Sequence, residues 1–123
     1  MSDVWIFYGI PHDHANFRRD YLAGKERKRD LGCHKDVKVG DRVLIYFQLP
    51  VGAIVAKGEV VGEPYKTNMG EPFLYRAPMI VQLLPRYIPL EVLKRKFPKL
   101  GSIRGKSKVP DEYAEEIWSM ATG

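Results

Sequence analysis

Aromatic and amide side chains follow one another in the segment Tyr46-Phe47-Gln48, just ahead of a turn at Pro50. An aromatic ring stacks on an unpaired nucleobase, and an amide hydrogen-bonds the edge of an adenine or a cytosine. Tyr8, at the end of an apolar run, is a second candidate for stacking. These residues predict a pocket for one extruded or unpaired base. The alternative is that Tyr46 packs under a helix, with its hydroxyl satisfied locally.

Two groups of cations, in residues 18–29 and 94–108, are candidates for holding a phosphate backbone. Ser102 and Arg104 lie next to glycines that let the backbone approach a phosphate or a base edge closely. The alternative for each group is an ordinary solvated face. The predicted nucleic-acid-binding residues are Tyr8, His12, Lys25, Arg27, Lys28, Tyr46, Phe47, Gln48, Ser102, Arg104 and Lys106.

Patterns typical of catalysis are weak. Lys57 and Glu59 point the same way from one alternating strand, which is typical of a solvent face with a weak ion pair. The sequence contains no nucleophile elbow and no phosphate-binding loop. We therefore expect a binding domain and not an enzyme. The alternatives are a small hydrolase or ribonuclease and a pure protein-interaction module.

The length and composition of the sequence predict one soluble domain over residues 1–123, either a whole protein or an N-terminal module of a longer one. The net charge of +5 suits an anionic partner without identifying it. The single cysteine excludes an internal disulfide, and no apolar run reaches the roughly 20 residues that a membrane-spanning helix needs. The acid near the N-terminus argues against a secretory signal, so we expect a cytoplasmic protein. Neither a metal nor a cofactor is expected, because zinc-ligand spacing is missing around His12, His14, Cys33 and His34.

The elements that must position these residues are short and punctuated by Pro and Gly, which favours an α+β fold with several strands. Period-two geometry places Val43, Ile45 and Phe47 on one face of a strand and Leu44 and Tyr46 on the other. We expect Trp5 and Phe7 in the core, Trp118 docking the last helix, and a bulge or bend at Gly58. We predict strands at 4–8, 42–48, 53–61, 73–84 and around Ile103, helices at 13–22, 90–97 and from Pro110, and loops at 25–30 and 66–71.

The segment 37–46, VKVGDRVLIY, resembles the K-x-G-D-x-(apolar)₃-Y signature of EVE domains. These domains belong to the PUA-like superfamily, together with YTH and ASCH domains. Further matches keep the order of the family: Trp5 in the first strand, residues 53–65, Ile88-Pro89-Leu90 with Leu93, and residues 105–117. The resemblance covers nearly the whole chain.

This resemblance implies a small PUA-like β-barrel of five or six strands flanked by helices, and DNA or RNA as the partner. EVE-like domains are associated with reading modified bases, such as methylated cytosine or adenine, and some serve as specificity modules of modification-dependent restriction systems. An ASCH-like hydrolase acting on modified nucleosides or RNA is the alternative. The chain departs from the family at Ala23, where members often carry a Trp that forms a wall of the pocket.

Overall fold

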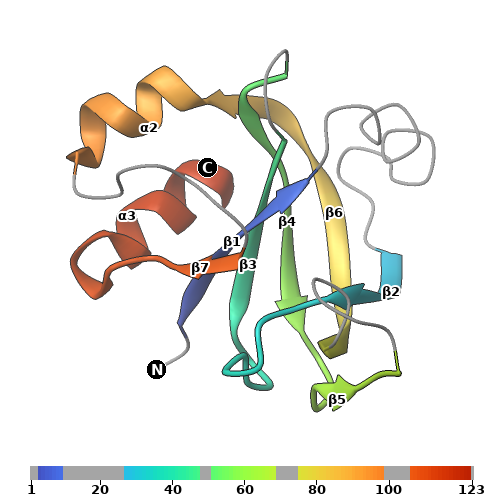
Figure 1. Cartoon of the computed structure of the whole chain (residues 1–123). Helices are drawn as coiled ribbons and strands as arrows, with labels where there is room; N and C mark the ends of the chain where they lie inside the picture. The colour runs from blue at the N-terminus through green and yellow to red at the C-terminus, as the bar shows by residue number, and fades with distance from the viewer. Residues whose placement is uncertain (1–2, 10–26, 48–50, 69–74, 99–105, 123) are drawn as a thin grey trace.

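The computed structural model describes residues 3–9, 27–47, 51–68, 75–98 and 106–122. Within these ranges, seven strands form one strongly curled sheet, and both helices lie on the same side of it (Figure 1). The predicted helix at 13–22 and the predicted strand around Ile103 lie outside the described residues. The elements are β1 (Val4–Gly9), β2 (Arg27–Gly32), β3 (Arg42–Phe47), β4 (Ala53–Val60), β5 (Tyr65–Lys66), β6 (Tyr75–Pro89), α2 (Leu90–Lys96), β7 (Lys106–Lys108) and α3 (Asp111–Thr122).

The strand order is β2-β6-β4-β3-β1-β7, and the two-residue β5 pairs with β6. β1 runs parallel to β3, so that Val4 lies beside Arg42 and Tyr8 beside Tyr46. The other pairs are antiparallel. Parallel strands need a long crossover, which the residues between β1 and β3 provide. Both faces of β1 are covered, which explains its continuous apolar sequence and confirms the strand predicted at 4–8.

The buried apolar side chains form two clusters, and alternating residues of the same strands belong to one or the other. Val43, Ile45 and Phe47 belong to the first cluster, together with Trp5 and Phe7. The second cluster joins the other face of the sheet to α2 and α3, and it contains Val4, Ile6, Leu44, Tyr46, Leu93, Phe97 and Ile117. The alternation predicted for 42–48 is therefore confirmed over β3, and both of its faces are core.

The bulge in β4 is not at Gly58, where the sequence predicted it. The pairing of β4 with its neighbours shifts around Val55, between Ile54 and Ala56. This shift places Ile54 in the helix-side cluster and Ala56 in the other. Gly58 has a different role: a Cβ there would lie 3.1 Å from the carbonyl oxygen of Ile80. The glycine lets β4 and β6 approach closely.

The prediction of a charged loop at 25–30 is wrong over its described part, because Arg27–Gly32 forms β2. The segment RKRDLG has no apolar alternation, and Lys28 and Asp30 are exposed. It becomes a strand because the 15-residue β6 offers an edge with which β2 can pair, from Arg27 beside Val81 to Gly32 beside Arg76. Such pairing is a tertiary effect that local propensity does not report.

Both helices that begin at a proline were predicted correctly. α2 starts after Pro89 and α3 starts after Pro110, whose carbonyl accepts a hydrogen bond from the backbone N–H of Tyr113. Leu93 and Ile117 anchor the two helices in the helix-side cluster. None of the described helices is long and apolar enough to span a bilayer.

Candidate nucleic-acid interface

The base slot predicted on Tyr8, Tyr46 and Gln48 is contradicted at Tyr46, whose ring was expected to stack on the base. Tyr46 is 4% exposed beneath the helices, and Phe47 is 3% exposed in the opposite cluster. The cause is the position of β3 between β1 and β4, with core on both faces. A nucleobase cannot stack on a ring that is already buried. The structure therefore supports the alternative, in which Tyr46 is a core residue under a helix.

The remaining predicted site residues are dispersed. Tyr8 pairs through its backbone register with Tyr46. Lys28 is exposed on β2, next to Arg27, whereas Lys106 belongs to β7. β2 and β7 stand at opposite ends of the strand order, so Lys28 and Lys106 are not on neighbouring strands. The other predicted residues, His12, Lys25, Gln48, Ser102 and Arg104, lie outside the described residues.

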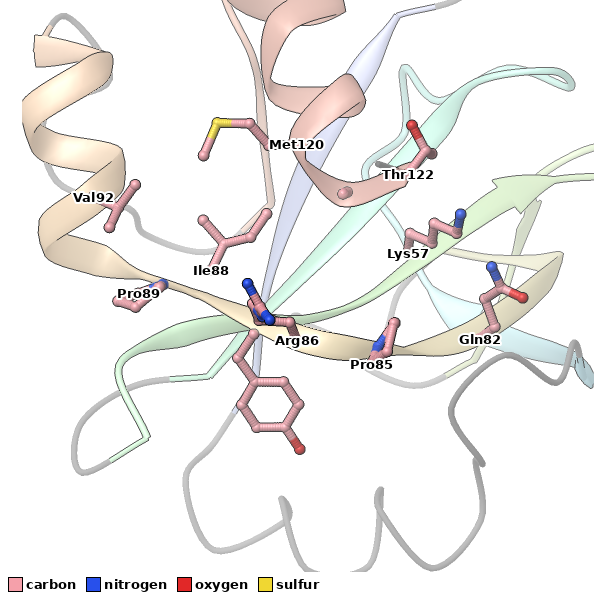
Figure 2. Close-up of a pocket in the computed structure, with 11 residues that line it drawn as sticks. Lys57, Gln82, Pro85, Arg86, Ile88, Pro89, Val92, Met120 and Thr122 are labelled. Atoms are coloured by element: carbon pink, nitrogen blue, oxygen red, sulfur yellow. The ribbon is translucent and has the colours of Figure 1, made fainter.

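A groove follows β6 on the helix side of the sheet. Its larger part, of about 810 Å³, lies between β6, β4 and the two helices. In Figure 2 the side chains of Lys57 and Gln82 lie together at one end, and Ile88, Val92 and Met120 gather at the other. A smaller hollow of about 150 Å³ shares Lys57 and Gln82 with the larger one. The two hollows together are called the β6 groove below. The smaller hollow is lined by Lys57, Gly58, Glu59, Ile80, Gln82 and Trp118.

Cations accompany β6 along this groove. Lys28 pairs with Ile80 across the β2–β6 ladder, and Lys57 pairs with Gln82 across the β4–β6 ladder. Directly paired residues share a face of the sheet, so both lysines flank the groove. Arg86 follows on β6 itself and is exposed. From Ile80 to Arg86 a strand spans about 20 Å. The chain then enters α2, whose last turn carries Lys94, Arg95 and Lys96.

Trp118 of α3 forms an aromatic wall of the groove. The Lys57 Nζ lies 6.0 Å from the centre of its ring, and the Arg42 guanidinium lies 5.4 Å from it, both within cation–π range. Arg42 also binds Glu115 in a bidentate pair, at 2.7 and 3.4 Å. The hydrogen bond from Arg42, and then its charge, hold the pKa of Glu115 below its usual range. These contacts fix α3 against the sheet and position Trp118.

Gln82 contributes an amide to the groove. The side chain is half-buried on the groove floor and makes no hydrogen bond within the described part of the chain. An amide offers both a donor and an acceptor, and these match the edge of a nucleobase. Arg86 likewise forms no ion pair with any described residue. The groove therefore combines cations, an aromatic wall and an amide without a hydrogen bond to any described residue.

The sequence did not reveal this combination. Lys57 and Glu59 were expected to point the same way from one strand, and both line the smaller hollow. Trp118 was expected to dock the last helix, and it is half-buried against the helix-side cluster. What was missed is that α3 lies beside β4 and β6, so that its Trp118 meets Lys57 and Gln82. The available signal was the polar residue Gln82 within the otherwise apolar run 77–84.

Comparison with solved structures shows the fold. The protein Atu2648 from Agrobacterium tumefaciens is 17% identical, with a TM-score of 0.62 over 98% of this chain and 93% of that one. Rpa0253 from Rhodopseudomonas palustris is 14% identical, with a TM-score of 0.63 over 98% and 93%. ASCH from Zymomonas mobilis is 12% identical, with a TM-score of 0.62 over 96% and 95%. The predicted small α+β fold, a curled sheet flanked by helices, is confirmed, and these proteins share it. At these identities the likeness concerns the fold alone.

Comparison of the sequence with family models and curated proteins identifies no family for this chain. No protein-family model matches the chain, and no curated protein matches it significantly.

Proposed function

We propose that this domain binds nucleic acid along the β6 groove and does so without catalysis. One observation carries the proposal: Lys28 and Lys57 flank β6 and Arg86 lies on it, next to the Trp118 ring and to Gln82, whose amide makes no hydrogen bond among the described residues. Cations spaced along a strand attract phosphates, and an aromatic wall with an adjacent amide suits a base. The three side chains on α2, Lys94, Arg95 and Lys96, extend the positive surface beyond Arg86.

The finer proposal is that the domain is EVE-like and recognises an extruded or unpaired modified base. It is supported by the EVE-like segment 37–46 and by the PUA-like fold, which ASCH from Zymomonas mobilis shares. In this proposal Trp118 takes the stacking role that Tyr46 cannot fill, and Gln82 takes the role expected of Gln48. A methylated cytosine or adenine is the proposed base, and a specificity module of a restriction system is the proposed setting.

Fluorescence polarisation tests the binding. The probes are 3′-labelled oligonucleotides with a 5′-hydroxyl, as single-stranded and duplex DNA and RNA, with and without methylated cytosine or adenine. We expect affinity to fall steeply as salt rises. The double variant Lys28→Glu, Arg86→Glu should bind at least about tenfold more weakly, with a salt slope lower by about 1.5.

The matched control for the single variant Lys28→Glu is Lys66→Glu, which changes the net charge equally at an exposed position outside the groove. It should retain most of the affinity. Equal losses in Lys28→Glu and Lys66→Glu would mean general charge attraction instead of a groove. Binding without salt dependence would favour a protein-interaction module. Equal affinity for methylated and unmethylated probes would reject the modified-base proposal while leaving the groove.

One observation favours a second function. Lys57 and Glu59 line the same small hollow, and an ASCH-like hydrolase or ribonuclease acting on modified nucleosides or RNA would use a Lys and a Glu in one cleft together with a Thr or Ser. Incubation with methylated nucleosides and single-stranded RNA, followed by chromatography of the products, separates the two functions. Turnover that disappears in Lys57→Ala would establish the enzyme and overturn the non-catalytic proposal.

A further inference from the structure

A hollow separate from the β6 groove, of about 630 Å³, lies where the start of β1 meets the connection between β2 and β3. It shares no lining residue with the β6 groove. Trp5 and His34 form its aromatic side, and Lys35, Lys38 and Lys108 supply its cations. The function proposed above does not use this hollow.

One buried carboxylate holds the walls of this hollow together. Asp41 is 3% exposed and accepts hydrogen bonds from the indole Nε1 of Trp5 at 3.0 Å and from the backbone N–H of Lys38 at 3.0 Å. It also accepts one from the backbone N–H of Asp3 at 3.1 Å. Both sides of the hollow are therefore fixed before any ligand arrives, which reduces the entropy cost of binding.

His34 is oriented in the same way. Its Nδ1 accepts a hydrogen bond of 3.1 Å from the backbone N–H of Asp36, so the neutral ring carries its proton on Nε2 and can donate there. Its ring stacks on Trp5 with centroids 5.1 Å apart and 27° between the planes. The side chain is 37% exposed, so a further flat ring can extend the stack from the side away from Trp5.

Three lysines line the hollow together with the carboxylates of Asp3 and Asp36, and the buried carboxylate of Asp41 lies behind them. Lys108 pairs with Asp3 at 3.5 Å and with Asp111 at 3.6 Å, and these carboxylates raise the pKa of Lys108. The second acid of the hollow, Asp36, approaches His34 Nδ1 at 3.6 Å. Lys35 and Lys38 are exposed and make no ion pair within the described ranges. An incoming anion therefore meets two ammonium groups that form no ion pair among the described residues, beside a stacked ring.

We propose that this hollow binds a 5′-nucleoside monophosphate unit. Its base stacks on His34 and continues the Trp5–His34 stack, and its phosphate monoester lies between Lys35 and Lys38. The unit is either a free mononucleotide or the 5′-phosphorylated end of a strand, and the two share the same base and phosphate chemistry.

The test uses the full chain with Trp118→Phe, which leaves Trp5 as its only indole. Trp5 fluorescence is followed during titration with AMP, CMP, adenosine and inorganic phosphate. We expect saturable quenching by the mononucleotides, with adenosine and phosphate each binding at least about tenfold more weakly. Lys35→Glu with Lys38→Glu should weaken mononucleotide binding about tenfold or more. His34→Ala should weaken AMP more than phosphate.

A matched control distinguishes ligand binding in this hollow from ligand binding in the β6 groove. Lys28→Glu with Arg86→Glu should leave mononucleotide binding unchanged even though it weakens oligonucleotide binding in the groove. Amide chemical shifts of the unsubstituted chain, followed by NMR during AMP addition, should change at His34, Lys35 and Lys38. Preference for a 5′-phosphorylated over a 5′-hydroxyl oligonucleotide identifies a strand end as the source, and binding of mononucleotides alone identifies a free nucleotide. The proposal is overturned if no ligand saturates, if phosphate binds as tightly as AMP, or if the lysine variant binds normally.

Discussion

Trp5 donates a hydrogen bond from its indole Nε1 to the Oδ2 of Asp41, at 3.0 Å and across 36 positions of the chain. The same carboxylate accepts hydrogen bonds from the backbone N–H groups of Asp3 and Lys38. Asp41 belongs to the segment that resembles the EVE signature, directly before β3. Its role in this fold is structural, because it joins the start of β1 to the turn that leads into β3.

Removal of this carboxylate should destabilise the domain. Asp41→Ala leaves the indole N–H and two backbone N–H groups without their acceptor, and we expect a loss of about 3 kcal/mol in the free energy of unfolding. Urea unfolding followed by circular dichroism measures it. Asp36→Ala, at an exposed position in the same connection, should cost about 0.5 kcal/mol or less. Similar losses in the two variants would contradict the role of Asp41.

The buried ring of Tyr46 predicts a stability effect. Tyr46→Ala should lower the free energy of unfolding by about 3–5 kcal/mol, since it empties a large site in the helix-side cluster. Tyr46→Phe keeps the ring and should cost much less. Thermal unfolding of both variants gives the comparison. A fully stable Tyr46→Ala protein would show that the ring is not in the core.

The Arg42–Glu115 pair predicts a pH dependence. The pKa of Glu115 is lowered from 4.5 in the folded state, so the folded protein holds the carboxylate more readily than the unfolded chain does. The pair's stabilisation is therefore present above the unfolded pKa and is lost as the pH falls through the folded pKa. Unfolding of the wild type and Glu115→Gln should differ at neutral pH and converge in acid. With Arg42→Lys as background the difference should shrink, because the bidentate geometry is gone. A pH-independent difference would refute the linkage.

Close approach of β4 and β6 at Gly58 predicts that Gly58→Ala is destabilising. The new methyl group would meet the carbonyl oxygen of Ile80 at 3.1 Å and the Val81 Cγ2 at 3.2 Å, so the strands must shift. We expect a cost of about 1–3 kcal/mol. Glu59→Ala, at the exposed neighbouring position, serves as the control in the same chemical denaturation series. Equal stability of Gly58→Ala and the wild type would show that β4 and β6 can move apart to accommodate the methyl group without cost.

Two substitutions of Trp118 distinguish base stacking on its ring from simple filling of the groove by its side chain. Trp118→Leu should weaken oligonucleotide binding about tenfold, whereas Trp118→Phe should keep most of the affinity, because stacking contributes roughly 1–3 kcal/mol per base. Polarisation titrations at one salt concentration are sufficient. Unchanged binding of Trp118→Leu would remove this ring from the interface.

Local patterns predicted the elements whose signals are local. The alternation of Val43 to Phe47 gave both faces of β3, and Pro89 and Pro110 marked the starts of the two helices. The strand β2 escaped prediction because only β6 makes RKRDLG a strand. Tyr46 was misjudged for a related reason: its face was correct, but the helices that cover this face pack on it from far along the chain. The same holds for the groove, which exists only once α3 places Trp118 beside Lys57.

β1 lies between β3 and β7, with Trp5 paired to Val43 on one side and to Lys108 on the other. A chain made from its N-terminus exposes this apolar strand long before either partner leaves the ribosome. Sheets closed by such distant partners form slowly, and their unpaired strands tend to aggregate meanwhile. Among the described strands, β1 therefore waits longest between its synthesis and the completion of its pairing, and VWIFY is an apolar segment that a ribosome-bound chaperone can bind in the meantime.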